Sequence, residues 1–260
     1  MTKFCTLYSS SSGNCTLISD NDTNILIDAG VSASKICDSL SEVGISPDEI
    51  DAILVTHEHS DHICGLRVLC RKYNISVYAS EKTAEKISET YPDISNVNIH
   101  SVLPSESFTI RSMTVRAFQT PHDSVQPFGY CIWSEDKKYC VATDTGTVTK
   151  SMLTNLAGAE AVLIESNHDE EMLKNGPYPY VLKKRILSDS GHLSNASCAW
   201  LSTQLALWGT KRIILGHLSE KNNTPQKAYE SAKNLLESNG FKVGNDVLLK
   251  VAPKNEICSI

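Results

Sequence analysis

The chain has 260 residues, of which 41% are hydrophobic and 21% are charged, a composition typical of a folded globular protein. Its formal net charge of −6 excludes a protein that coats nucleic acid through a general positive charge, so any nucleic-acid contact must be local. No apolar run approaches the roughly 18 residues that cross a bilayer. Residues 1–10 lack the apolar core of a signal peptide, so we expect neither membrane contact nor secretion.

The nine cysteines are odd in number and scattered along the chain, with no CxxC pair among them. This spacing argues against a disulfide framework and against a cysteine-rich zinc site. Most of them lie in apolar stretches, as Cys131 and Cys198 do, where a free thiol packs as a small hydrophobic group. We therefore expect a reducing compartment, the cytoplasm.

Short apolar runs rich in β-branched residues, with polar or glycine-containing flanks, predict strands along the whole chain. In chain order they cover residues 4–8, 16–19, 24–27, 52–55, 76–79, 97–102, 114–118, 129–134, 139–142, 161–164, 212–215 and 246–251. Turn-forming or charged residues at 20–22 and 135–137 each interrupt a pair of these runs and predict hairpins. The serine run at 9–12 predicts a tight turn before Gly13.

Capping residues and apolar spacing predict helices between the strands. The predicted elements are a short turn from Pro47, an apolar helix from Ile63, a helix from Ser194 to Gly209 and a last helix from Thr224 to Gly240. Two segments, DAILVTH at 51–57 and EAVLIES at 160–166, are similar, which suggests two halves that each form a sheet with helices outside. No linker or low-complexity tract divides the sequence, so we expect one α/β domain over residues 1–260.

The segment THEHSDH at 56–62 concentrates metal-ligand residues directly after a predicted strand. Alternate spacing lets His57 and His59 point the same way in an extended chain. Asp61 and His62 then turn toward a second point as the chain enters the next helix. This arrangement favours two adjacent metal ions over one, and over a polar loop without metal.

Four more residues of ligand type follow apolar runs or precede a predicted helix, where α/β folds commonly assemble sites. They are His122, Asp144, His192 and His217. HEHSDH followed by the distal His, Asp and His resembles the metallo-β-lactamase superfamily over nearly the whole chain. This resemblance implies an αββα sandwich, with two mixed β-sheets flanked by helices and metals at one edge.

Further segments are similar to those of the bacterial YycJ/WalJ (VicX) family. They are SSSSGNCTLI, TPHDSVQPFGY, ATDTG, ESNHDEEML, SGHLSN and GHLSEKNNTP. This closer resemblance implies a nuclease, with 5′-to-3′ DNA exonuclease activity linked to repair.

The superfamily pattern also implies two divalent metal ions, zinc or manganese, between which ligand spacing does not choose. It assigns His57, His59 and His122 to the first ion, Asp61, His62 and His217 to the second, and Asp144 to a bridge between them. A metal-bridging hydroxide would then attack phosphorus while Asp61 orients it. The histidine at position 59 differs from the glutamate that diiron oxygen-reducing members usually carry.

By resemblance to related phosphodiesterases, His192 contacts the phosphate or protonates the leaving group. Its place beside a predicted helix N-terminus also favours phosphate. Further candidates for substrate contact each have a structural alternative, such as a hairpin turn, a position behind the ligands or a solvated helix face. They are Ser12, Asn14, His168, Lys183, Lys184 and Arg185. The last three, with Tyr178 and Tyr180, form a basic and aromatic cluster suited to a phosphate backbone.

Three interpretations stay open from the sequence. The first is a phosphodiesterase or nuclease whose partner is nucleic acid, with DNA favoured over RNA. The second is a hydrolase of a small phosphodiester, a thioester or a lactone. The third, of another class, is a non-catalytic interaction protein that the metals stabilise. The His192 loop and the basic cluster favour phosphate, and the sequence leaves the oligomeric state open.

Overall fold

The computed structural model describes residues 2–94 and 99–260, whose strands form two seven-stranded sheets. The first sheet has the order β14 (Cys258–Ser259), β1 (Lys3–Ser10), β2 (Gly13–Ser19), β3 (Asn24–Ile27), β4 (Ala52–Leu54), β5 (Ser76–Ala79) and β6 (Ile99–Ser101). The second has the order β13 (Leu248–Val251), β12 (Arg212–Gly216), β11 (Ala161–Glu165), β10 (Lys137–Ala142), β9 (Phe128–Ser134), β8 (Met113–Gln119) and β7 (Ser107–Ile110).

Both sheets are mixed and repeat one pattern of strand directions. In the first sheet β1, β2 and β3 pair antiparallel, and β3 to β6 pair parallel. In the second sheet β8, β9 and β10 pair antiparallel, and β10 to β13 pair parallel. The two similar segments of the sequence, which form β4 and β11, therefore occupy the same place in the two sheets.

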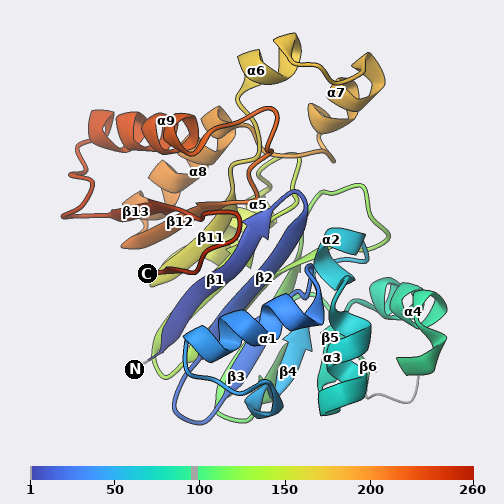
Figure 1. Cartoon of the computed structure of the whole chain (residues 1–260). Helices are drawn as coiled ribbons and strands as arrows, with labels where there is room; N and C mark the ends of the chain where they lie inside the picture. Colours follow the sequence, from blue (N-terminus) through green and yellow to red (C-terminus); the bar gives the residue numbers. More distant parts are fainter. Residues whose placement is uncertain (1, 95–98) are drawn as a thin grey trace.

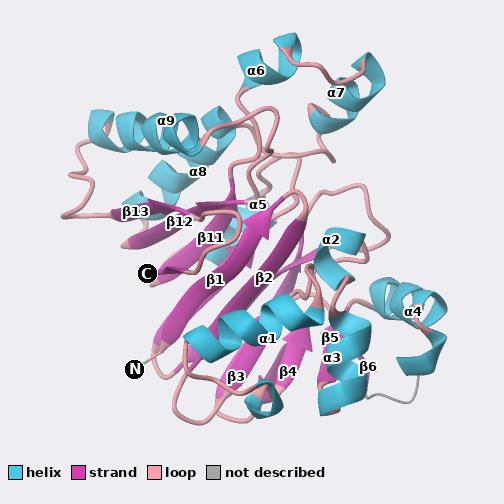
Figure 2. Ribbon diagram, in the orientation of Figure 1, coloured by secondary structure: helices cyan, strands magenta, loops and turns pink. Residues whose placement is uncertain are grey.

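Helices cover the outer faces of the two sheets, as Figures 1 and 2 show. Beside the first sheet lie α1 (Ala33–Glu42), α2 (Ser60–Ile63), α3 (Leu66–Tyr73) and α4 (Glu81–Thr90), with short 3₁₀ turns at Pro47–Glu49 and Pro92–Ile94. Beside the second lie α5 (Lys150–Leu156), α8 (Asn195–Leu207) and α9 (Pro225–Ser238). Two further helices, α6 (Glu170–Asn175) and α7 (Tyr180–Ile186), form a lobe beyond one end of the sheets. The predicted fold class, two mixed sheets flanked by helices, is confirmed.

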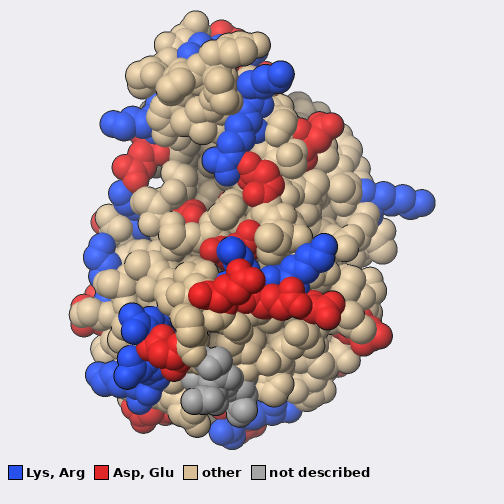
Figure 3. Space-filling model, turned by 90° about the vertical axis from the view of Figure 1, so that its right-hand side faces the viewer, with Lys and Arg blue, Asp and Glu red and all other residues tan. Residues whose placement is uncertain are grey.

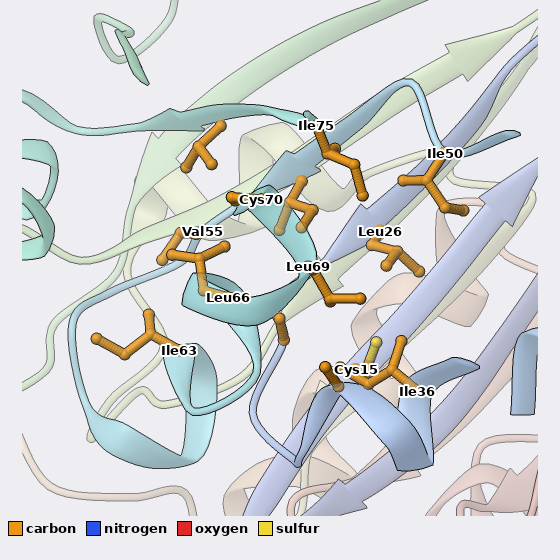
Figure 4. Packing of buried hydrophobic residues seen from close by; sticks show 14 of the residues in the cluster. Cys15, Leu26, Ile36, Ile50, Val55, Ile63, Leu66, Leu69, Cys70 and Ile75 are labelled. Atoms are coloured by element: carbon orange, nitrogen blue, oxygen red, sulfur yellow. The ribbon is translucent and has the colours of Figure 1, made fainter. Parts of the chain in front are cut away.

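The hydrophobic core lies in three layers. Between the sheets, side chains such as Ile25 and Ile27 pack with Tyr130 and Leu163. A second cluster fills the space between the first sheet and its helices, where Leu66 and Leu69 of α3 point toward the strands (Figure 4). A third cluster joins the second sheet to α5, α8 and α9. The two outer clusters pack the helices closely against the strands. Because the candidate ligands follow the ends of these strands, this packing limits their movement.

The predicted strands are present: the runs at 24–27 and 76–79 match β3 and β5 residue for residue, and the others have at least one end shifted by one to three residues. Residues 97 and 98 of the predicted run at 97–102 lie outside the described residues. The sequence patterns missed β7 and β14, two short strands at sheet edges. The last predicted strand begins at Leu248 instead of residue 246, because Asp246 accepts a hydrogen bond from the backbone N–H of Lys242 within a turn. The predicted serine turn before Gly13 is a hairpin between β1 and β2.

The helix expected from Ile63 begins earlier, at Ser60, and is divided by Gly65 into α2 and α3. A Cβ atom at Gly65 would lie 2.3 Å from the carbonyl oxygen of Val31, so this close approach requires glycine. Within the described ranges, none of the helices combines the length and the apolar character that crossing a membrane requires.

Candidate metal centre

The candidate ligands gather at the end of the sheets that carries the α6–α7 lobe (Figure 1). His57 follows β4, His122 follows β8, Asp144 follows β10 and His217 follows β12. All four side chains are buried, although each is polar. Asp144 and His217 also have positive φ angles of 54° and 56°, a conformation that costs energy in non-glycine residues and is concentrated at functional sites.

The first group of side chains consists of His57, His59 and His122, whose candidate ligand atoms lie within 4.8 Å of one another. Nε2 of His57 lies 3.0 Å from Nδ1 of His59. Nδ1 of His122 lies 3.1 Å from the carbonyl oxygen of Gly191 and donates to it, which fixes the ring and leaves Nε2 as the free acceptor. This is the geometry of three nitrogen ligands that face one point.

The second group consists of Asp61, His62 and His217, and Asp144 lies between the groups. A carboxylate oxygen of Asp61 is 3.5 Å from Nε2 of His62 and 3.6 Å from Nε2 of His217. Asp144 is 3.1 Å from Nε2 of His62, 3.5 Å from Nε2 of His217 and 3.6 Å from Nε2 of His122. One carboxylate therefore approaches nitrogens of both groups, which is where a bridging ligand must lie.

The donor set fits metal ions on an observation independent of the motif. Nε2 of His122 and Nε2 of His217 are buried and have no hydrogen-bond partner among the described residues. A buried imidazole nitrogen without a partner is costly in free energy, so such atoms need an explanation. Both nitrogens face Asp144, and a cation between them would satisfy all three groups.

Two buried carboxylates that the sequence analysis did not single out hold the histidine rings from behind. Asp28 accepts from Nδ1 of His62 at 2.8 Å. Glu165 accepts with one oxygen from Nδ1 of His217 at 2.8 Å and from Nδ1 of His192 at 2.7 Å. Such partners fix the ring orientation and leave Nε2 for a metal. Both carboxylates lie at the end of an apolar strand, the same signal that pointed to Asp144.

The electrostatics of the cluster favour cations. Burial lowers the pKa of His217, but Asp144, Asp61 and Glu165 outweigh burial and raise it to about 10. Burial raises the pKa of Glu165, yet His192 and His217 outweigh it and lower the pKa to about 2. The pKa of Asp61 likewise lies well below its usual value, mainly because His62 outweighs burial. The carboxylates therefore stay charged, and a divalent cation would offset their charge.

A cavity of about 230 Å³ opens above the two groups. Its floor carries His59, Asp61, His122, Asp144, His192 and His217. His192 is partly exposed to this cavity, and because Glu165 holds its Nδ1, Nε2 is the nitrogen left for a substrate. The expected help from a helix N-terminus is absent among the bonds described at α8. The N–H groups of Asn195 and Ser197 donate to the carbonyl of His168 and the hydroxyl of Ser194 instead.

The remaining predicted substrate contacts separate in the structure. Arg185 lines the cavity, whereas Lys183 donates to the carbonyl of Lys174, and Lys184 is exposed and is not among the residues that line the cavity. Ser12 lies exposed at the hairpin tip, where its hydroxyl donates to Glu220. Asn14 is buried, and its side-chain nitrogen lies 3.2 Å from Nε2 of His62, the nitrogen that faces the ligand group. His168 is only 1% exposed and pairs through its backbone with Ser194, so it has no surface to offer a substrate.

Comparisons with known proteins agree with this geometry. The family described as the beta-lactamase superfamily domain matches residues 23–218. The chain belongs to this superfamily. A curated relative, exodeoxyribonuclease WalJ of Streptococcus pneumoniae, is 40% identical over 246 residues, which cover 94% of this chain and 91% of the relative. Exodeoxyribonuclease YycJ of Bacillus anthracis is 38% identical over 241 residues, with 93% and 91% coverage.

Among solved structures, the metallo-beta-lactamase fold protein YhfI of Bacillus subtilis matches with a TM-score of 0.72. The match covers 99% of each chain at 15% identity, so it supports the fold alone. The predicted membership of the WalJ/YycJ family within the superfamily is confirmed by the two curated relatives. The predicted class, a metal-dependent hydrolase, is confirmed with it, and the His and Asp groups provide a metal site.

Proposed function

We propose that this chain is an exodeoxyribonuclease that removes nucleotides from DNA, beginning at a 5′ end. The observation that carries the proposal is the 40% identity to exodeoxyribonuclease WalJ over nearly the full length of both chains. The cavity is consistent with a phosphodiester substrate, because a histidine outside the two ligand groups and one arginine line it beside the ligands. A thioester or lactone would need neither group.

Two divalent ions, zinc or manganese, fit this site in our proposal. His57, His59 and His122 would hold one ion, Asp61, His62 and His217 the other, and Asp144 would lie between them. Ions bound there would activate water and offset the negative charge of the phosphodiester. Because the ligands come from both sheets, we propose that residues 1–260 act as one catalytic unit. All nine cysteines are free thiols, which supports a cytoplasmic site of action.

The protein groups have separate roles in this proposal. Asp61, whose side chain is 23% exposed, accepts a hydrogen bond from the attacking water and orients it. His192 presents Nε2 to the leaving oxygen and supplies its proton. Glu165 holds His192 in that orientation through Nδ1. The carbonyl of Gly191 holds His122, so the loop that carries His192 also positions a ligand.

The test is a cleavage assay on DNA labelled at either end, as single strand and as duplex, with RNA and a small phosphodiester beside it. The metal-free protein is loaded with zinc or with manganese, and Asp144→Ala serves as the inactive control. Stepwise loss of nucleotides from the 5′ end supports the proposal and identifies the metal. Cleavage of the small phosphodiester alone rejects a polymer substrate. If the metal-loaded protein cleaves none of the phosphate compounds, thioesters and lactones become the proposed substrates.

A further inference from the structure

The cavity above the ligands has one apolar wall, and that wall comes from a single segment of the chain. The apolar side chains that line the cavity are Tyr178, Leu182 and Ile186, which belong to α7 and the residues just before it. The opposite side is formed by polar residues, among them Ser11 and Ser219. Metal binding by the ligand groups does not require an apolar surface on one side of the cavity. The apolar wall therefore indicates that part of the substrate is itself apolar.

The wall is fixed to the metal centre at two points. The guanidinium of Arg185 forms two contacts with the carboxylate of Asp123, of which Nη2 to Oδ1 is 3.0 Å, and Asp123 directly follows the ligand His122. The backbone N–H of His192 donates to the carbonyl of Ile186 at 3.0 Å. The wall therefore keeps a defined position relative to His122 and to His192, the histidine proposed to protonate the leaving oxygen.

Charge on this wall is limited to one residue. Arg185 is the one lysine or arginine among the described residues that line the cavity. The lobe carries further basic side chains on its outer surface, and acidic side chains gather across the middle of the face in Figure 3. The cavity lining therefore offers a bound substrate one cation beside an apolar surface.

We propose that the α7 wall is a nucleoside subsite that takes one unpaired base of the substrate strand. The proposal rests on the proposed function. The base stacks on Tyr178 and packs against Leu182, the phosphodiester to be cleaved lies on the floor, and Arg185 contacts the neighbouring phosphate. Aromatic side chains bind bases in this way without regard to sequence, because every base has a π-face.

The small size of the cavity favours an unpaired base. At about 230 Å³ it lies below the range of roughly 300–1,000 Å³ typical of small-molecule sites, so a single base fits it better than a base with its pairing partner. An enzyme that handles one base in such a pocket acts on single strands or extrudes the base from the duplex. The substrate class is therefore single-stranded DNA, or duplex whose end has opened.

The test uses the full chain loaded with metal and compares Tyr178→Ala with Tyr180→Ala. Tyr180, the first residue of α7, is 79% exposed and does not line the cavity, so it is the matched control. On single-stranded oligonucleotides, Tyr178→Ala should lower kcat/KM about 10- to 100-fold, the range expected for loss of one stacked base. Tyr178→Phe, which keeps the aromatic ring, should recover most of the kcat/KM that Tyr178→Ala loses. Blunt duplex should be cleaved more slowly than single strands.

A second set of substrates separates stacking from misfolding. Oligonucleotides that carry an abasic residue at the first, second or third position from the end lack one base each. When the abasic residue stands at the position that occupies the subsite, kcat/KM of the wild type should fall by the same 10- to 100-fold. On that substrate, kcat/KM of Tyr178→Ala should fall no further. Equal activity of Tyr178→Ala and Tyr180→Ala, or losses in Tyr178→Ala that persist on every abasic substrate, would overturn the subsite. A wild type that cleaves no DNA would instead overturn the proposed function itself.

Discussion

Replacing Glu165 with glutamine tests whether one buried carboxylate holds both His217 of the second group and His192 in place. One oxygen of Glu165 accepts from Nδ1 of both His192 and His217, and the other accepts from the N–H groups of Thr145 and Leu193 at 2.9 and 3.1 Å. Glutamine has one oxygen and one NH₂ group, so in either orientation its NH₂ faces two donors. The substitution therefore removes acceptors without changing the size of the side chain.

The magnitude follows from the two orientations. If the NH₂ group faces Thr145 and Leu193, two buried N–H groups lose their acceptor, at a cost of about 2 to 6 kcal/mol in unfolding free energy. If it faces the imidazoles, Nδ1 of His217 must become an acceptor and the proton moves to Nε2, which removes that atom as a ligand. We therefore expect Glu165→Gln to lose stability in the first orientation and about 10- to 100-fold in metal affinity in the second.

Urea unfolding of the metal-free protein measures the first effect, and metal content after dialysis against a graded chelator measures the second. Glu160→Gln is the matched control, because Glu160 precedes the same strand and pairs with the partly exposed Arg212 at 2.8 Å. That exposed pair should be worth at most about 1 kcal/mol. A Glu165→Gln variant as stable as Glu160→Gln, with full metal content, would refute the reasoning.

Four further outcomes are expected. Asp144→Ala should abolish DNA cleavage and lower the metal content measured by mass spectrometry, and retention of both metals would remove Asp144 from the bridge. His192→Ala should keep the metals and lower kcat about 100- to 10,000-fold, so an unchanged kcat would contradict its role. Chelation of the metals should lower the Tm in calorimetry, and re-addition should restore it, since ligands of the folded state stabilise it. At Gly30 a Cβ atom would lie 1.6 Å from the carbonyl oxygen of Asp61, so Gly30→Ala should cost at least ~2 kcal/mol in urea unfolding and weaken metal binding.

The elements that the sequence predicted best are those whose signals are local. The run at 24–27 is β3 and the run at 76–79 is β5, because β-branched residues end at polar or turn residues on both sides. Ser194 and Thr224 cap α8 and α9 through their side chains, as their types and positions predicted. The edge strands β7 and β14 were missed for different reasons. β14 has only two residues and is a strand because it pairs with β1, near the other end of the sequence. β7 forms a hairpin with the adjacent strand β8, a local signal that the sequence patterns did not detect.

The seven residues predicted as ligands could be singled out because each is a strong ligand type in a recognisable motif or after a strand, and the structure brings them together. The carboxylates behind them, Asp28 and Glu165, could not be ranked in the same way. A carboxylate at a strand end becomes a partner of histidine only when distant residues, such as His62 or His192, fold against it. That information lies in the tertiary structure, although the position after an apolar strand is a usable signal.

The basic cluster at 183–185 shows that residues adjacent in the sequence need not act together in the structure. Three consecutive residues of a helix point about 100° apart, so they cannot share one surface. Arg185 faces the cavity, Lys183 binds the carbonyl of Lys174, and Lys184 belongs to neither contact. Of the three basic residues, the structure places Arg185 at the cavity, and Tyr178 of the same cluster also lines it. The contact of these residues with phosphate stays a prediction.

The two halves of the chain explain why the site lies where it does. Asp28-Ala29-Gly30 follows β3 and Asp144-Thr145-Gly146 follows β10, equivalent strands in the two sheets, and both aspartates have positive φ, 63° and 54°. The imidazole of His62 lies between them, with Nδ1 at 2.8 Å from Asp28 and Nε2 at 3.1 Å from Asp144. Each half thus contributes one such loop to His62. The loop with Asp28 orients the ring through Nδ1, and the loop with Asp144 places a carboxylate beside Nε2. Since Asp28 and Asp144 belong to different sheets, any change in how the sheets pack would move one relative to the other. Metal binding is therefore coupled to the core between the sheets.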